Sequence, residues 1–181
     1  MQGRLTAALL AIASACAAPR AAGLSPWPSV PLAALGFPRA ATQAVEVTRD
    51  GTTQAFVARL ESDAARLVLA GVAPAGPRLF RLERTAAGVT AEASELVPRE
   101  LRPEYVLADL ELAFAPLEAL RVAFQGTEWT LEETARTRTL RRGGEVVAVV
   151  RRAADDAWAG PVEVESLRFG YRLRVETVER E

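Results

Sequence analysis

The stretch Val45–Glu61, VEVTRDGTTQAFVARLE, decides the fold of this 181-residue chain. Apolar residues occupy alternate positions on both sides of Arg49-Asp50-Gly51. A period of two is typical of a strand with one buried and one wet face. Asp-Gly between two such runs favours a tight turn. The stretch therefore predicts an antiparallel β-hairpin.

The same alternation recurs along most of the chain, in runs separated by turn residues such as Gly143-Gly144. The further runs are Leu67–Leu69, Phe80–Leu82, Val89–Ala93, Trp129–Leu131, Thr137–Arg141, Glu145–Arg152, Val162–Val164 and Tyr171–Val175. Short strands at such close spacing are typical of an antiparallel meander. We expect about nine strands, with a helical insert after the fifth.

The helical insert begins near Pro103, where the period of the apolar residues changes. They now fall at intervals of three and four, at Leu107, Leu110, Phe114 and Leu117. This spacing predicts an amphipathic helix, in which Asp109 and Glu111 point away from the apolar residues and Asp109 can cap the helix or pair with an Arg. Because proline disrupts a helix interior, Pro116 is expected to end this helix and to start a second one that reaches Phe124.

These elements predict a mainly β (α+β) domain built on one antiparallel, strongly curved sheet. Such a sheet tends to curl toward a barrel, so we expect a half-open barrel with the helical insert as its lid. The candidates for the lining of its apolar cavity are Phe80, Leu82, Leu110, Phe114, Trp129, Leu131, Tyr171 and Leu173. The alternative is that these side chains pack against one another as a solid core.

The N-terminal sequence is typical of an export signal. Arg4 precedes the apolar stretch LTAALLAIASAC, which ends at Cys16, the one cysteine of the chain. This layout is typical of a bacterial lipoprotein signal, with residues 1–15 removed and Cys16 lipidated. Ala13-Ser14-Ala15 also fits an ordinary secretory signal, which is the alternative interpretation.

Two further segments follow the signal. Residues 16–41 are rich in Ala and Pro and are expected to form an extended tether. Trp27, Leu32, Leu35 and Phe37 either dock part of this tether on the domain or stay solvated. Residues 42–181 are expected to form one domain. Ala17, rather than Asp, follows Cys16, so we expect sorting to the outer membrane.

The composition argues against catalysis. The chain has no His, and its 22 basic residues are all Arg against 23 acidic residues. It therefore lacks the residue types of a His-based triad, an imidazole metal site or a lysine Schiff base, and it has no basic surplus for nucleic acid. Asp155-Asp156 can hold a cation, but such a pair is more often solvated surface. We expect no enzyme, no metal and no cofactor.

Several short motifs resemble a known family. They are Leu69-Ala70-Gly71 with Leu79-Phe80, Leu107–Ala113, Arg138-Thr139-Leu140 and Gly170-Tyr171-Arg172-Leu173. In their order they resemble an uncharacterised family of bacterial outer-membrane lipoproteins, a domain of unknown function often encoded beside aryl polyene or fatty-acid-type biosynthesis genes. Phe114-Ala115-Pro116 departs from its pattern, which has an aromatic residue just before the proline. The family is similar in outline to the Lol-type lipoprotein carriers, which have an unclosed barrel over an acyl-binding cavity.

This resemblance implies lipid handling in a Gram-negative envelope. We expect a monomeric, non-catalytic lipoprotein that binds an acyl or polyene chain, or a lipoprotein's lipid, and that is anchored at the periplasmic face of the outer membrane. The alternative function is a structural or assembly lipoprotein that acts through protein partners. The alternative location is the soluble periplasm.

Overall fold

The computed structural model describes residues 20–21, 25–74, 76–97 and 102–181. The expected signal peptide and Cys16 therefore lie outside the described residues. In the described part, eleven strands form one sheet in the order β1-β6-β5-β4-β3-β2-β11-β10-β9-β8-β7. The strands are β1 (Arg20–Ala21), β2 (Ala40–Arg49), β3 (Thr52–Ser62), β4 (Arg66–Val72), β5 (Arg78–Thr85), β6 (Gly88–Ala93), β7 (Trp129–Thr134), β8 (Thr137–Arg142), β9 (Glu145–Arg152), β10 (Val162–Ser166) and β11 (Tyr171–Arg180).

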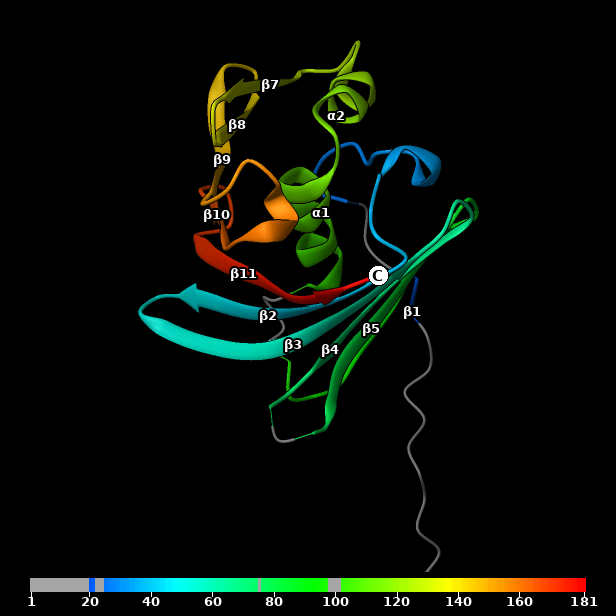
Figure 1. Cartoon of the computed structure of the whole chain (residues 1–181). Helices are drawn as coiled ribbons and strands as arrows, with labels where there is room; N and C mark the ends of the chain where they lie inside the picture. Colours follow the sequence, from blue (N-terminus) through cyan, green and yellow to red (C-terminus); the bar gives the residue numbers. More distant parts are fainter. Residues whose placement is uncertain (1–19, 22–24, 75, 98–101) are drawn as a thin grey trace, which may run out of the picture.

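The sheet consists of two antiparallel meanders. One runs from β2 to β6 and the other from β7 to β11, and the pairing of β2 with β11 joins them. The sheet curves strongly around the helices in Figure 1 and stays open, because its edge strands β1 and β7 do not pair with each other. The predicted mainly β, half-open architecture is confirmed. The number of strands is higher than about nine, since the short strand β1 adds to ten longer ones.

The hairpin turns follow from their residues. Asp50 and Gly51, between β2 and β3, both have positive φ angles, of 49° and 75°. Gly143 and Gly144, between β8 and β9, have φ angles of 55° and 90°. Two consecutive residues with positive φ give the turn whose twist matches that of paired strands, and Gly and Asp tolerate this conformation best. Both predicted hairpins are confirmed.

Two helices follow β6, as predicted: α1 (Pro103–Phe114) and α2 (Leu117–Phe124). Helix α1 starts with a proline at its first turn and ends at Phe114, and the backbone of its C-cap residue, Ala115, is extended because Pro116 follows it. It lies inside the curve of the sheet and contacts β5, β6 and β10. Helix α2 lies against β7.

The two acidic residues in the middle of α1 do not lie at the surface. Asp109 and Glu111 are 0% and 2% exposed, because the sheet covers one side of the helix and an N-terminal segment covers another. Charged residues at such positions need partners, since a buried unpaired charge is costly. The partners come from distant parts of the chain.

The N-terminal segment, residues 25–39, is packed on the domain. Trp27, Val30 and Leu35 are buried in the core. Phe37 contacts the ring of Trp158 edge-on, with the ring centroids 5.3 Å apart. A short 3-10 helix, η1 (Leu32–Ala34), lies between Val30 and Leu35 in the sequence. Of the two alternatives for these residues, the structure therefore shows docking rather than solvation.

Candidate functional site

The predicted cavity-lining residues contact one another. Phe80, Leu82, Leu110, Phe114, Trp129, Tyr171 and Leu173 are buried in one core, and Leu131 is half-buried against it. In the described part of the chain, α1 and residues 25–39 occupy the concave side of the sheet (Figure 1). Three of the eight also border surface pockets. Phe80 borders one of about 250 Å³ beside β3 and β5, whereas Trp129 and Leu131 border one of about 480 Å³ between α2 and β7.

Glu111 joins α1 to the N-terminal segment. Its carboxylate pairs with Arg84 of β5 and accepts a hydrogen bond of 3.1 Å from the backbone N–H of Val30. Arg84 also donates to the carbonyl oxygen of Val30. Burial raises the pKa of Glu111, and Arg84 opposes that change. Residue 30 is thus held through both of its backbone polar groups.

Asp109 holds a second buried contact, to the start of β11. Its Oδ2 atom accepts a hydrogen bond from the Tyr171 hydroxyl, whereas Oδ1 has no hydrogen-bond partner among the described residues. Burial raises the pKa of Asp109 to about 7, despite the opposing hydrogen bond from Tyr171. Burial and the neighbouring carboxylate raise the pKa of Tyr171 as well.

Arg138 of β8 caps the end of α1. Its Nη1 group lies 2.9 Å, 3.3 Å and 2.7 Å from the carbonyl oxygens of Leu112, Ala113 and Ala115. The last carbonyls of a helix lack internal partners and carry the negative end of its dipole. The Nε group of Arg138 donates to Glu133 at 2.6 Å. These contacts fix α1 relative to the sheet.

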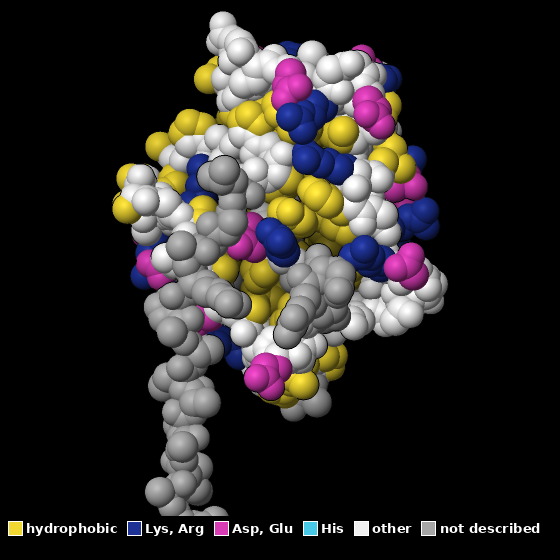
Figure 2. All heavy atoms as spheres, turned by 180° about the vertical axis from the view of Figure 1, so that it is seen from behind, with side chains coloured by type: hydrophobic (Ala, Val, Ile, Leu, Met, Phe, Trp, Pro, Cys, Tyr) yellow, Lys and Arg dark blue, Asp and Glu magenta, His cyan; other side chains and the backbone are white. Residues whose placement is uncertain are grey.

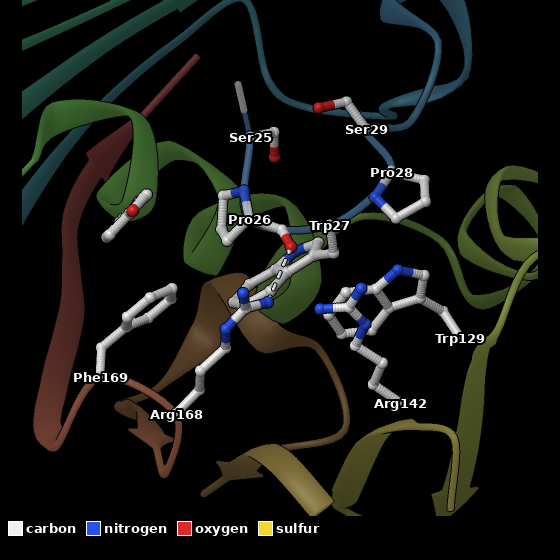
Figure 3. A pocket seen from close by; sticks show the side chains of 10 residues that line it. Ser25, Pro26, Trp27, Pro28, Ser29, Trp129, Arg142, Arg168 and Phe169 are labelled. Atoms are coloured by element: carbon white, nitrogen blue, oxygen red, sulfur yellow. Dashed lines mark hydrogen bonds between the residues drawn. The ribbon is translucent and has the colours of Figure 1, made fainter. Parts of the chain in front are cut away.

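Beside this fixed helix lies an open groove of about 540 Å³ (Figure 3). Its walls come from residues 25–29, the first turn of α1, strand β7, the end of β8 and the turn between β10 and β11. The lining residues are Ser25, Pro26, Trp27, Pro28, Ser29, Tyr105, Trp129, Arg142, Arg168 and Phe169. Four of these ten residues are aromatic.

The aromatic rings of the groove contact one another in two groups. Trp27 meets Trp129 edge-on, with ring centroids 6.1 Å apart. Tyr105 stacks on Phe169 at 4.3 Å, and Phe169 lies 6.4 Å from Tyr171 in a parallel orientation. The second group therefore connects the groove to the buried hydrogen bond between Tyr171 and Asp109.

Two arginines add positive charge to the groove. The guanidinium of Arg142 lies 5.4 Å from the ring centre of Trp129, and that of Arg168 lies 5.4 Å from the ring centre of Phe169. Arg142 also pairs with Glu128 at 2.6 Å. Seen from behind, the molecule has a hollow of hydrophobic side chains with Arg side chains at its border (Figure 2). An apolar floor with a few polar groups is the usual character of a ligand pocket.

The sequence predicted only Trp129 among the groove residues. Trp27 belonged to the expected tether, whereas Tyr105 and Phe169 were not singled out. The sequence around two of these residues, Trp27 and Phe169, contains a local indication that the side chain is held by a contact. Trp27 lies between two prolines, and Phe169 follows Arg168 in a turn. Large aromatic residues in irregular segments are often held there by a contact, but sequence alone does not name the partner.

The described residues contain no group of three or more His, Cys, Asp or Glu placed to hold a metal. Asp155 pairs with Arg136 at 3.0 Å. Asp156 caps a 3-10 helix, η2 (Ala157–Ala159), and pairs with Arg180 at 2.9 Å. The acidic pair thus serves local structure. None of the described helices is long and apolar enough to cross a membrane.

Comparisons with known proteins give distant structural matches. A proposed outer membrane lipoprotein-sorting protein domain from Vibrio parahaemolyticus is 10% identical, with 78% of this chain and 83% of that chain covered and a TM-score of 0.39. A DUF1329 family protein from Desulfovibrio piger is 10% identical, with 80% and 86% covered and a TM-score of 0.27. No curated protein matches the chain. The family model described as "Protein of unknown function (DUF3261)" matches residues 40–179, and the chain therefore belongs to this family.

Proposed function

We propose that the protein is a non-catalytic lipoprotein of the bacterial envelope that binds an acyl or polyene chain of a lipid. The observation that supports this proposal most directly is the aromatic groove beside α1. Its volume of about 540 Å³ falls within the range of roughly 300–1,000 Å³ that is usual for small-molecule sites. A chain lying in it contacts Trp27, Trp129, Tyr105 and Phe169.

The driving force for such binding is the removal of the chain from water. Each buried CH₂ group contributes about 0.8 kcal/mol, so ten of them contribute about 8 kcal/mol before the cost of association is subtracted. The rings that receive the chain are already ordered by their mutual contacts and by the fixed position of α1. Less conformational entropy is therefore lost on binding than at a flexible site.

The proposed location follows from the signal at the N-terminus. Residues 25–29 form one wall of the groove and lie shortly after Cys16 in the sequence. Lipidation of Cys16 holds this wall near a membrane surface, where acyl chains are available. Outer-membrane sorting is the proposed destination, because Ala17 is not an aspartate.

The first experiment is native mass spectrometry of the full-length protein extracted from its own membrane. A co-purifying lipid in addition to the expected covalent anchor supports the proposal. Protein that is free of any such ligand, and that does not bind added fatty acid, contradicts it.

The second experiment uses brominated fatty acids, which quench tryptophan fluorescence at short range. Two of the three tryptophans, Trp27 and Trp129, line the groove, whereas Trp158 packs between Phe37 and Phe114. The Trp158→Phe variant should therefore keep strong quenching. A variant with both Trp27→Phe and Trp129→Phe should lose most of it. Equal quenching of the two variants argues that the chain does not lie in the groove.

A second candidate function is binding of a protein partner in envelope assembly. One observation favours it: Val122 of α2 is 64% exposed and borders the pocket between α2 and the edge strand β7. A photo-crosslinking residue at position 122, tested in native membranes, should capture a discrete partner if this candidate is correct. The same residue at Val178, which is 70% exposed on β11, serves as the control.

A further inference from the structure

The polar groups of the aromatic groove are mainly hydrogen-bond donors. Arg142 and Arg168 carry positive charge, and no lining residue is acidic. The indole N–H of Trp27 and the hydroxyl of Ser25 are buried and find no hydrogen-bond partner among the described residues. Trp27 is only 3% exposed. An indole nitrogen can only donate, and a guanidinium has five donors and no acceptor.

Buried donors without partners are rare in folded proteins, because each one loses its hydrogen bonds to water. Most such groups are satisfied by water or by a ligand. Trp27 and Ser25 are separated by a single residue, and both line the groove. Their position predicts that an acceptor enters the groove beside them.

Arg168 is the second part of this argument. In the described part of the chain, the one hydrogen bond of its side chain reaches the carbonyl oxygen of Pro26 at 3.5 Å (Figure 3), which is long. The carboxylate of Glu128, which pairs with Arg142, also attracts the guanidinium of Arg168, so that one carboxylate serves both arginines. Arg142 already has Glu128 as a partner for its Nε and Nη2 groups. The groove therefore holds more positive charge and more donors than its own acceptors use.

We infer that the groove binds an anionic oxygen group, a carboxylate or a phosphate, at the donors of Arg168, Trp27 and Ser25. This inference rests on the proposed function and names its ligand class, an anionic amphiphile. The apolar chain lies on the aromatic rings, and the head group accepts hydrogen bonds beside Pro26. Charge-assisted hydrogen bonds of this kind are the stronger ones in proteins.

The test compares three probes with the same chain: dodecanoic acid, monododecyl phosphate and 1-dodecanol. Each is titrated into the full-length protein by calorimetry, below the concentration at which it forms micelles. The two anionic probes should bind at least about tenfold more tightly than the alcohol, since one charge-assisted hydrogen bond corresponds to roughly 10- to 100-fold in affinity. The preference between carboxylate and phosphate identifies the head group.

Variants locate the contact. Arg168→Gln should weaken binding of the anionic probes about tenfold or more and leave the affinity for the alcohol unchanged. Arg168→Lys, which keeps the positive charge, should bind the anionic probes more tightly than Arg168→Gln does. The control is Arg174→Gln, because Arg174 is an exposed arginine of β11 that pairs with Glu163. This variant should change neither the affinity for the anionic probes nor the affinity for the alcohol. The thermal midpoint of each variant shows that it is folded.

Two results overturn the inference in different ways. If all three probes bind with equal affinity, and Arg168→Gln does not change it, the proposed anion site is wrong but the proposed binding of the apolar chain still holds. If no probe binds to the folded protein, both the proposed anion site and the proposed function are wrong.

Discussion

Replacement of Asp109 by Asn should abolish a specific dependence of stability on pH. In the unfolded chain this carboxyl titrates near its ordinary pKa of 3.8, whereas burial in the folded protein raises its pKa to about 7. Below about pH 4 the group is neutral in both states. Between pH 4 and pH 7 the unfolded chain loses this proton while the folded protein keeps it. The free energy of unfolding therefore falls as the pH rises through this window, and the loss is complete above about pH 7.

The magnitude follows from the two pKa values. The change from 3.8 to about 7, at about 1.36 kcal/mol for each tenfold change in proton affinity, corresponds to a loss of at most ~4 kcal/mol. Asn has the same shape and no charge, and its Oδ1 atom can accept the hydrogen bond of the Tyr171 hydroxyl. At low pH the variant should be slightly less stable than the native protein, by about 1 kcal/mol, because a buried amide donor gains no partner. At pH 8 it should be more stable.

Urea denaturation between pH 4 and pH 8.5 measures this difference directly. At each pH, the free energy of unfolding of the native protein is subtracted from that of the variant. This difference cancels the contribution of Glu111 and of the other carboxyl groups, which both proteins share. Tyr171→Phe provides a second variant. It removes the hydrogen bond that lowers the pKa of Asp109 in the folded protein, so the upper end of the window should move to higher pH, while its lower end stays at the pKa of the unfolded chain. A difference in stability between Asp109→Asn and the native protein that stays constant over this pH range would refute the reasoning.

Three further changes have defined outcomes. Arg138→Ala should lower the free energy of unfolding by about 3 kcal/mol in urea titration, because it leaves the last carbonyls of α1 without this partner and the half-buried Glu133 with Arg152 alone; Arg141→Ala, a half-buried residue of the same strand, should cost far less. Gly71→Ala should cost about 1–3 kcal/mol in the same assay, since the added Cβ would overlap the ring of Phe80 on β5; a cost below 0.5 kcal/mol would contradict the close packing. Cys16→Ser should abolish incorporation of a tagged fatty acid in cells, and equal labelling of the variant would exclude lipidation at that residue.

Local patterns in the sequence predicted the elements of this fold well. Alternation around Asp50-Gly51 and Gly143-Gly144 identified hairpins, because turn geometry and strand burial are properties of neighbouring residues. Pro103 and Pro116 marked the helix boundaries for the same reason. The pairing of Gly71 with Phe80 across β4 and β5 also gives a physical basis for two of the motifs noted in the sequence. The side chain of Phe80 occupies the space that only a glycine leaves open.

The environment of α1 and the groove could not be predicted in this way. Asp109 and Glu111 were expected to point away from the apolar residues of the helix, but they are buried with Tyr171 and Arg84, which lie 62 and 27 residues away in the sequence. The groove likewise combines Trp27, Arg142 and Phe169 from three separate segments. A single sequence shows the period of a helix, but it does not show which distant side chain neutralises a charge.

The order of the strands has a consequence for how the chain folds. Among the described strands, every pairing except those of β1 with β6 and β2 with β11 joins strands that are consecutive in the chain. Each meander can therefore form through local contacts, which close quickly. The β2–β11 pairing brings together opposite ends of the domain, and its loop-closure entropy must be lost before its hydrogen bonds form. We expect the pairing of β2 with β11 to form late and to set the folding rate. Because α1 contacts both meanders, at β5 and β6 and at β10, its burial should be completed in the same step.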